Sequence, residues 1–484
     1  MADRRPNILF IMTDDHAAHA MSCYGSRINE TPHLDRIAAG GMRFDNCFCT
    51  NSICTPSRAA ILCGAYNHVN GVTTLATHMD NRLTTFPKLL RAAGYQTAVF
   101  GKWHLGQGPA HEPAGFDAWS VLPGQGLYHD PEFIEPDGKK VVPGYATDII
   151  TDRSIDWIRS RDPDRPFCLL THHKAPHRPW EPDERHARMY EDVEIPYPET
   201  FDDDYATRAA AAAAATMRIE RDLNEVDLKS APPPGLDADG EKRWKYQRYI
   251  KDYLRCIASV DDNVGRLLDA LDAEGLAEDT VVVYTSDQGF FLGDHGWFDK
   301  RFMYEESLRM PFVIRYPRAI APGSSCRDMI LNVDFAQTFL DLARVDAPDA
   351  MQGRSFRPLL QGERPADWQT AMYYRYWMHG AHHNVYAHYG VRTERYKLIY
   401  YYAHPLDAVP AEEWEARSND HQDFAAHPPE WELFDLQEDG HELRNVYDDP
   451  AYAEVRDRLV AELDRLQKAV GDEPFDPDAW PAPR

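Results

Sequence analysis

Long apolar runs are missing from the sequence, and cysteine is sparse. No apolar run among the 484 residues reaches the roughly 20 residues that a membrane-spanning helix needs. The eight cysteines lack the density of a disulfide-stabilised domain, and Cys47 and Cys49 lack the spacing of a zinc site. The apolar run Ile8–Met12 is too short for a signal peptide, and no small-residue cleavage site follows it. We therefore expect a cytoplasmic protein without a membrane partner.

Positive charge is also scarce. Lys and Arg number 52 against 78 Asp and Glu, which gives a formal net charge of −26. Nucleic acids and anionic membranes bind to positively charged surfaces, so this balance argues against both as partners. A small anionic ligand would need a local cluster of Lys, Arg, His or a metal ion, acting at short range where salt screens little.

The length and the alternation of strands and helices predict an α/β protein of two domains. A chain of 484 residues exceeds what one hydrophobic core usually supports. Strand patterns alternate with helix patterns at Thr85–Ala93 and 244–273, which is typical of a large, mostly parallel sheet sandwiched by helices. We expect this domain to span residues 1–365, with an acidic, Pro- and Ala-rich insertion of partly helical character at 185–243. The strands expected in the large sheet are Asn7–Met12, Gln96–Phe100, Phe167–Thr171 and Thr280–Tyr284.

The remaining residues, 366–484, predict a smaller C-terminal α+β domain containing an antiparallel sheet. Its segment Tyr373–His383 is interpreted as core and interface, with a place in the ligand pocket as the alternative. Residues 471–484 are Pro-rich and acidic and are expected to form a surface arm or a disordered tail. Either could contact a second subunit, so a homo-oligomer is left open. The expected strands are Ala371–Trp377, Val385–Val391, Tyr396–Tyr402 and Trp431–Leu436, packed by the helix Val455–Ala469.

Acidic residues follow two strands of the predicted large sheet. Asp14 and Asp15 follow the first strand, and Asp287 and Gln288 follow the fourth. Because open α/β sheets bind ligands at the carboxyl ends of their strands, we expect these side chains to meet. A single pair of acids is also common in turns and helix caps, but two acidic strand ends favour a metal site. Three carboxylates and an amide oxygen suit one divalent ion, with calcium first and magnesium or manganese as alternatives.

A short motif suggests the chemistry. The pentapeptide Cys54-Thr55-Pro56-Ser57-Arg58 resembles the signature of type I sulfatases, in the alkaline phosphatase superfamily. The resemblance implies that Cys54 is oxidised to formylglycine by a formylglycine-generating enzyme. The hydrated aldehyde at Cys54 is then the nucleophile and a further metal ligand, and Arg58 stabilises it.

Further segments match the same family in the same order along the chain. The resemblance implies that Lys102 lies near the nucleophile and the substrate oxygens, and that His104 is the base for the second hydroxyl of the hydrate. His177 and Lys300 match residues that hold the ester oxygens and protonate the leaving group. Each of these four has a structural alternative when taken singly, and their common order favours the catalytic interpretation. Gln288 departs from the family's usual Asn or His, which leaves the metal's identity open.

The sequence therefore predicts an enzyme that hydrolyses aryl or sugar sulfate monoesters, small anionic substrates, by S–O cleavage through a sulfated formylglycine. A phosphonate monoester or phosphodiester hydrolase with the same site is the first alternative, because such an ester carries the same charge as a sulfate ester. A non-catalytic anion-binding protein is the second, for the case in which Cys54 stays a thiol. The segment Gly289–Lys300 is similar to that of sulfatases that act on amino-sugar sulfates, and the natural substrate is left open.

Overall fold

A ten-stranded sheet forms the centre of the protein in the computed structural model, which describes residues 5–405 and 424–476. Parallel pairing joins β1 to β8 and β9, and β4 to β8 and β5. The predicted α/β fold class is confirmed, and the four expected strands are β1, β4, β8 and β9. In spatial order the strands are β13 (Ser324–Cys326), β2 (Met42–Phe44), β12 (Phe312–Arg315), β9 (Thr280–Ser286), β1 (Asn7–Thr13), β8 (Phe167–His172), β4 (Gln96–Lys102), β5 (Ala118–Leu122), β6 (Glu132–Glu135) and β7 (Gly138–Val141).

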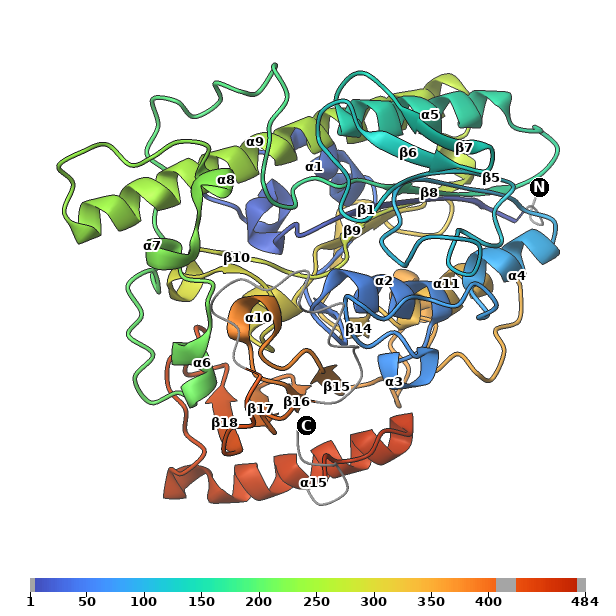
Figure 1. Ribbon diagram of the computed structural model, residues 1–484. Helices are drawn as coiled ribbons and strands as arrows, with labels where there is room; N and C mark the ends of the chain where they lie inside the picture. Colours follow the sequence, from blue (N-terminus) through green and yellow to red (C-terminus); the bar gives the residue numbers. More distant parts are fainter. Residues whose placement is uncertain (1–4, 406–423, 477–484) are drawn as a thin grey trace.

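Helices cover both faces of this sheet (Figure 1). The central strands β1, β8 and β9 are buried along their whole length, which explains their near-continuous apolar sequences. On one face lie α1 (Pro32–Ala39), α5 (Ala146–Ser160) and the long α9 (Ala238–Ala273). On the other lie α2 (Cys54–Cys63), α4 (Phe86–Ala92) and α11 (Asp334–Leu342).

The strand register brings the carboxyl ends of the central strands together. Met12 pairs with His172, which in turn pairs with Gly101, and Thr13 pairs with Ser286. Gly101 has a φ of 106°, and a Cβ there would overlap the His172 carbonyl, so only glycine fits. The residues that follow these four strand ends therefore share one edge of the sheet.

A separate antiparallel sheet forms the C-terminal part, as predicted. Its order is β15 (Ala371–Tyr376), β16 (His388–Thr393), β17 (Tyr396–Tyr401) and β18 (Glu430–Asp435), and α15 (Ala453–Val470) packs on it. Strand β16 begins three residues later than the sequence indicated, because 381–384 form the short helix α13 (Ala381–Asn384) with positive φ at His382 and Asn384. The proposed domain boundary at residue 365 stays a prediction.

The segment 185–243 is partly helical, with α6 (Ala210–Ala214), α7 (Ile219–Asp222), α8 (Glu225–Leu228) and the start of α9. Short elements complete the fold: α3 (Asn67–Asn70), α10 (Glu305–Leu308) and α12 (Arg357–Leu360), and the strand pairs β10 (Phe291–Leu292) with β11 (Phe298–Asp299) and β3 (Cys47–Phe48) with β14 (Ile330–Leu331). Within residues 5–405 and 424–476, no helix combines the length and apolar character needed to cross a bilayer.

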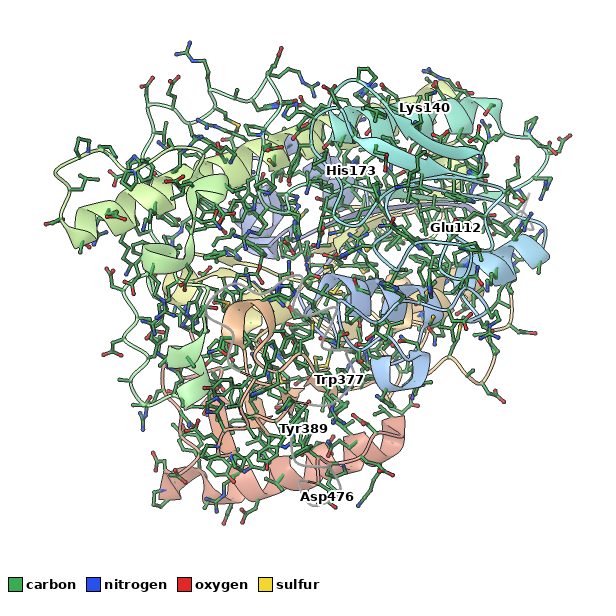
Figure 2. The ribbon with its side chains drawn as sticks, in the orientation of Figure 1. Glu112, Lys140, His173, Trp377, Tyr389 and Asp476 are labelled. Atoms are coloured by element: carbon green, nitrogen blue, oxygen red, sulfur yellow. The ribbon has the colours of Figure 1, made fainter. Side chains whose placement is uncertain are left out.

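A buried ion pair fixes the end of α15 to the C-terminal sheet. Arg375 donates to Asp472 over 2.7 Å, and the Tyr373 hydroxyl donates to the same carboxylate over 2.6 Å. The Arg375 guanidinium also lies over the rings of Trp377 and Tyr389, both labelled in Figure 2. The first residues after α15 are thus packed against this chain and do not form a free arm, while residues 477–484 lie outside the described part.

We expect Asp472→Ala to lower the free energy of unfolding by about 3 kcal/mol, because it leaves the buried Arg375 guanidinium without its carboxylate and the Tyr373 hydroxyl without its acceptor. The matched control is Asp464→Ala, also on this C-terminal region, whose partner Lys468 is 70% exposed and whose pair should contribute little. Thermal melting of the two variants and the wild type checks this. Equal shifts for both variants would contradict a special role for the buried pair.

Candidate active site

Cys54 is the first residue of α2 and faces the acidic strand ends. Its side chain is buried, and the first turn of the helix is held against the end of β9, because Ser57 donates to the Asp287 carbonyl. Burial raises the pKa of the Cys54 thiol to about 11, an effect that the nearby charge of Lys300 only partly offsets. An unmodified Cys54 is therefore a neutral thiol at neutral pH, and a poor nucleophile.

Asp14, Asp15 and Asp287 bring three carboxylates to the carboxyl edge of the sheet, all buried. The Asp15 amide donates to Asp287 Oδ1 over 3.2 Å, which ties the ends of β1 and β9 together. Asp15 adopts a φ of 70°, a strained conformation for a residue other than glycine. Burial, together with the nearby charge of Asp287, raises the pKa of Asp15 to about 7, against the opposing effect of Lys300.

Three cations neutralise these carboxylates. Lys300 Nζ donates to both Asp15 oxygens, at 2.7 and 2.8 Å, and Arg58 Nε donates to Asp287 Oδ2 over 2.9 Å. Lys102 Nζ donates to Asp14 Oδ2. Although burial disfavours its charge, the carboxylates of Asp15 and Asp299 raise the pKa of Lys300, so it stays protonated.

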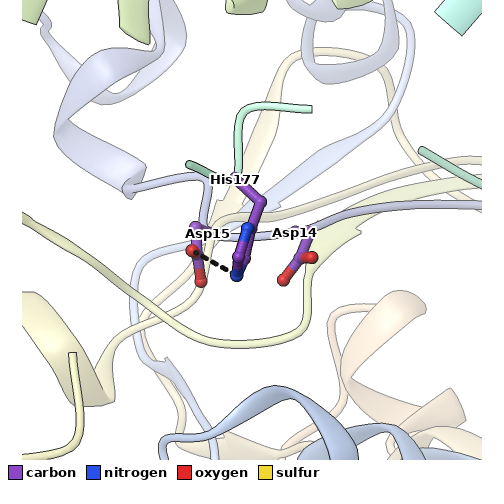
Figure 3. Close-up of side chains that lie close together, drawn as sticks. All are labelled: Asp14, Asp15 and His177. Carbon is purple, nitrogen blue, oxygen red and sulfur yellow. Dashed lines mark ion pairs between the residues drawn. The ribbon is translucent and has the colours of Figure 1, made fainter. Parts of the chain in front are cut away.

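His177 lies between the two acids that follow β1 (Figure 3). Its Nε2 is 3.7 Å from Asp15 Oδ2, and its Nδ1 donates to the Arg178 carbonyl over 2.8 Å. Burial, followed by the charges of Lys102 and Lys300, lowers the pKa of His177 well below its usual range. The ring is therefore neutral at neutral pH, with its proton on Nδ1 and its lone pair on Nε2.

His104 follows β4 and lies near the helix that carries Cys54. It is only partly buried and has a φ of 54°. The Thr55 hydroxyl donates to the His104 carbonyl over 2.8 Å and lies 3.3 Å from His104 Nδ1. Because that hydroxyl uses its hydrogen on the carbonyl, Nδ1 is the donor of the second contact.

The acidic edge fits a hard divalent cation. Asp14, Asp15 and His177 each have a ligand atom within 4.8 Å of the others. Asp14 Oδ1 and Gln288 Oε1 are buried, and within the described residues neither accepts a hydrogen bond. Gln288 instead donates its amide to Asp15 Oδ1. Buried oxygens without donors beside clustered carboxylates are the environment that calcium and magnesium prefer.

Two side chains of this site were missed by the sequence reasoning. Gln125 Oε1 accepts a hydrogen bond from Lys102, and it lies on the loop after β5, the next strand in the sheet. Lys174 is 2% exposed, lies 4.6 Å from the centre of the Tyr128 ring, and donates to the Arg178 carbonyl over 3.3 Å. Burial lowers the pKa of Lys174 to about 8. Their positions could have predicted them, since Gln125 follows β5 and Lys174 follows β8, two strands of the same sheet.

Comparison with known proteins agrees with this geometry. The family model described as sulfatase matches residues 6–345, and the model described as N-sulphoglucosamine sulphohydrolase, C-terminal, matches 293–417 and 422–469. An N-acetylglucosamine-6-O-sulfatase of Bacteroides thetaiotaomicron is 44% identical over 521 residues, covering 98% of this chain and 88% of that protein.

Two solved structures have similar folds. One, in complex with its substrate D-glucosamine-2-N,6-O-disulfate, has a TM-score of 0.90 at 43% identity and covers 98% of this chain and 100% of its own. A phosphonate monoester hydrolase from Silicibacter pomeroyi has a TM-score of 0.74 at 23% identity, covering 96% and 95%. At that identity the second likeness concerns the fold alone.

We expect calcium to stabilise the metal-depleted protein, by about 2.7 kcal/mol at a hundred times its dissociation constant, because it binds only the folded acidic edge. Since the pKa of Asp15 is raised from 3.8 to about 7, the metal-free fold loses stability as the pH rises between these values. The cation reverses that loss, so its effect should be larger at pH about 8 than at pH about 5.5.

Thermal melting with calcium, magnesium and manganese measures this effect and ranks the ions. Asp15→Asn should abolish the response. The matched control is Asp261→Asn, a buried acid on α9 whose carboxylate accepts hydrogen bonds from the His33 and Leu34 amides and is not among the residues proposed to hold the ion. It should melt lower yet keep the response to calcium. A response that survives in Asp15→Asn would contradict the proposed metal site.

Proposed function

This chain belongs to the sulfatase family, and on that premise we propose that it removes the 6-O-sulfate of a glucosamine residue. It is a sulfuric ester hydrolase that acts on sulfate monoesters. The observation that carries the proposed substrate is the high identity, over nearly the whole chain, to a relative named for N-acetylglucosamine 6-O-sulfate. The structural likeness to a protein bound to a 6-O-sulfated glucosamine supports the same substrate class.

Sulfatases in general use a metal ion and a formylglycine. We propose that Asp14, Asp15, Asp287 and Gln288 hold the ion, calcium in the first place, together with residue 54 after oxidation by a formylglycine-generating enzyme. Bound there, the ion and the aldehyde hydrate would supply a nucleophile that attacks sulfur near neutral pH. The high pKa of the unmodified Cys54 thiol supports this, since the thiol itself is a poor nucleophile.

The remaining residues would bind and orient the ester. Arg58 and Lys102 each keep one carboxylate in place and present positive charge to the sulfate oxygens. His104 would accept a proton at Nε2, because its Nδ1 faces the Thr55 hydroxyl. Preorganised cations of this kind stabilise the negative charge that develops on the oxygens of a sulfuryl group in transfer.

Protonation of the sugar oxygen would fall to Lys300 and His177. Lys300 is held protonated by Asp15 and can donate to the departing oxygen. His177 is neutral in the free protein, and an anionic ester bound beside it favours protonation at Nε2, which then donates to an ester oxygen. A sugar alkoxide is a strong base, so its departure depends on these donors.

We expect mass spectrometry of the peptide Phe44–Arg58 from the native host to find an aldehyde in place of the Cys54 thiol. The thiols of Cys47 and Cys49 lie in the same peptide and serve as internal controls, because the signature places only Cys54 before Thr-Pro-Ser-Arg. An unmodified residue 54 in active protein would contradict the proposed nucleophile.

We expect kcat/KM for N-acetylglucosamine 6-sulfate to exceed that for a phosphonate monoester or phosphodiester. Cys54→Ala and Lys300→Ala should each lower kcat by about a thousandfold or more on the sugar sulfate, because each removes a group that acts only in the transition state. Lys468→Ala, on the exposed face of α15, is the control and should keep full activity. A clear preference for the diester would favour the alternative phosphonate or phosphodiester function.

A further inference from the structure

The segment 185–243 reaches the active site through one buried acid. Asp227 in α8 is 2% exposed and binds Arg178 with both carboxylate oxygens, at 3.0 and 2.5 Å. Arg178 directly follows His177, and its backbone carbonyl accepts the hydrogen bond from His177 Nδ1. The position of the His177 ring is therefore linked to a carboxylate far along the chain.

Asp227 is itself fixed from two sides. It is the N3 residue of a capping box, in which Asn224 accepts from the Asp227 amide and the Asp227 carboxylate accepts from the Asn224 amide. At the other end of α8, Lys229 donates to Asp252 of α9 over 2.8 Å. The short helix is thus anchored on the longest helix of the fold, and it presents the Asp227 carboxylate rigidly to Arg178.

From Arg178 the contacts continue to Lys300. Arg178 Nη1 packs 3.5 Å from His383 Nε2, and His383 Nε2 lies 3.2 Å from Asp299 Oδ2. Since one ring nitrogen cannot accept from Arg178 and donate to Asp299 at once, the contact with Arg178 is one of packing. The other Asp299 oxygen accepts from the Lys300 amide over 2.9 Å. His383 Nδ1 donates to the Thr216 carbonyl over 2.8 Å, so the segment 185–243 holds this imidazole as well.

The backbone on both sides of Lys300 is strained. Asp299 has a φ of 78° and Arg301 a φ of 95°, values that non-glycine residues rarely adopt. Such conformations persist only where surrounding contacts enforce them. His383 and Arg301 both bind the Asp299 carboxylate, Arg301 over 3.0 Å, and these contacts supply that constraint.

We infer that Asp227 is a positioning residue, which through Arg178 and His383 fixes His177 and Lys300 relative to each other for protonation of the leaving group. The inference rests on the proposed function, because it needs those two side chains to act on the departing oxygen. It gives the segment 185–243 a role in catalysis that its composition does not reveal. Asp227 itself touches neither nucleophile nor sulfate in this arrangement.

The test exploits the different leaving groups of two sulfate esters. 4-Nitrophenolate departs as a weak base and needs little protonation, whereas a sugar alkoxide needs it fully. We expect Asp227→Asn to lower kcat for glucosamine 6-sulfate by about tenfold or more, and kcat for 4-nitrophenyl sulfate by less than about threefold. Loss confined to the poor leaving group is the signature of misplaced proton donors.

Three matched variants sharpen the comparison. Asp227→Glu keeps the negative charge, and Glu suits the same position of a capping box. The ratio of kcat for glucosamine 6-sulfate to kcat for 4-nitrophenyl sulfate should therefore stay within about threefold of the wild type. Arg178→Lys keeps the charge but loses the two-pronged contact, and should repeat the effect of Asp227→Asn. Asp183→Asn, a buried acid paired with Arg185 and His186 instead, should leave the ratio unchanged.

The outcomes separate the inference from the proposed function. A wild type that is inactive on glucosamine 6-sulfate contradicts the proposed substrate. In that case kcat for a simple alkyl sulfate is compared with kcat for 4-nitrophenyl sulfate instead. Equal losses on both esters in Asp227→Asn and Arg178→Lys would overturn the inference, since they would indicate general damage to the site. If Asp227→Asn melts at too low a temperature to be assayed, the kcat values of Arg178→Lys on the two esters test the inference in its place.

Discussion

Three carboxylates, those of Asp14, Asp15 and Asp287, are buried side by side at one edge of the large sheet, and their mutual repulsion is the constraint around which the site is built. Buried like charges are unfavourable unless cations accompany them. Lys102, Lys300 and Arg58 each pair with one of the three acids. These cations come from helix α2, the end of strand β4 and the segment after β11, so pairing the acids brings distant parts of the chain together.

The C-terminal part of the chain contacts the loop that carries one of these cations. Lys300 faces Asp15 from a backbone in which Asp299 and Arg301, on either side of it, adopt strained conformations. The contacts that enforce this conformation come from His383, in the C-terminal part, and from the Tyr376 hydroxyl, which lies 3.3 Å from Arg301 Nη1. The C-terminal sheet thus supports the active-site loop, in addition to burying its own core.

Much of this arrangement could be predicted from the sequence, because it depends on local patterns. Buried strands are apolar throughout, and polar residues after them must meet at the sheet edge, which predicted that Asp14 and Asp287 lie together. Lys102 and His177 were predicted from the resemblance of their segments to the sulfatase family. Gln125 and Lys174 were missed because each is a single polar residue without a motif. Asp227 could not be found either, since its significance depends on a contact with Arg178 across 49 positions of the chain, which no periodicity encodes.

Charge balance explains how a protein with a net charge of −26 can bind an anionic ester. Each of the three acids is paired with a basic side chain, so none of them faces a bound anion uncompensated. A divalent cation held by the acids would add positive charge to the site, and Lys174 lies buried nearby. In a site screened from salt these short-range attractions outweigh the distant surface acids, whose influence decays over about 8 Å at physiological ionic strength. On the proposed function, a metal held there would serve substrate binding as well as activation of the nucleophile, because it would free the cations from the carboxylates.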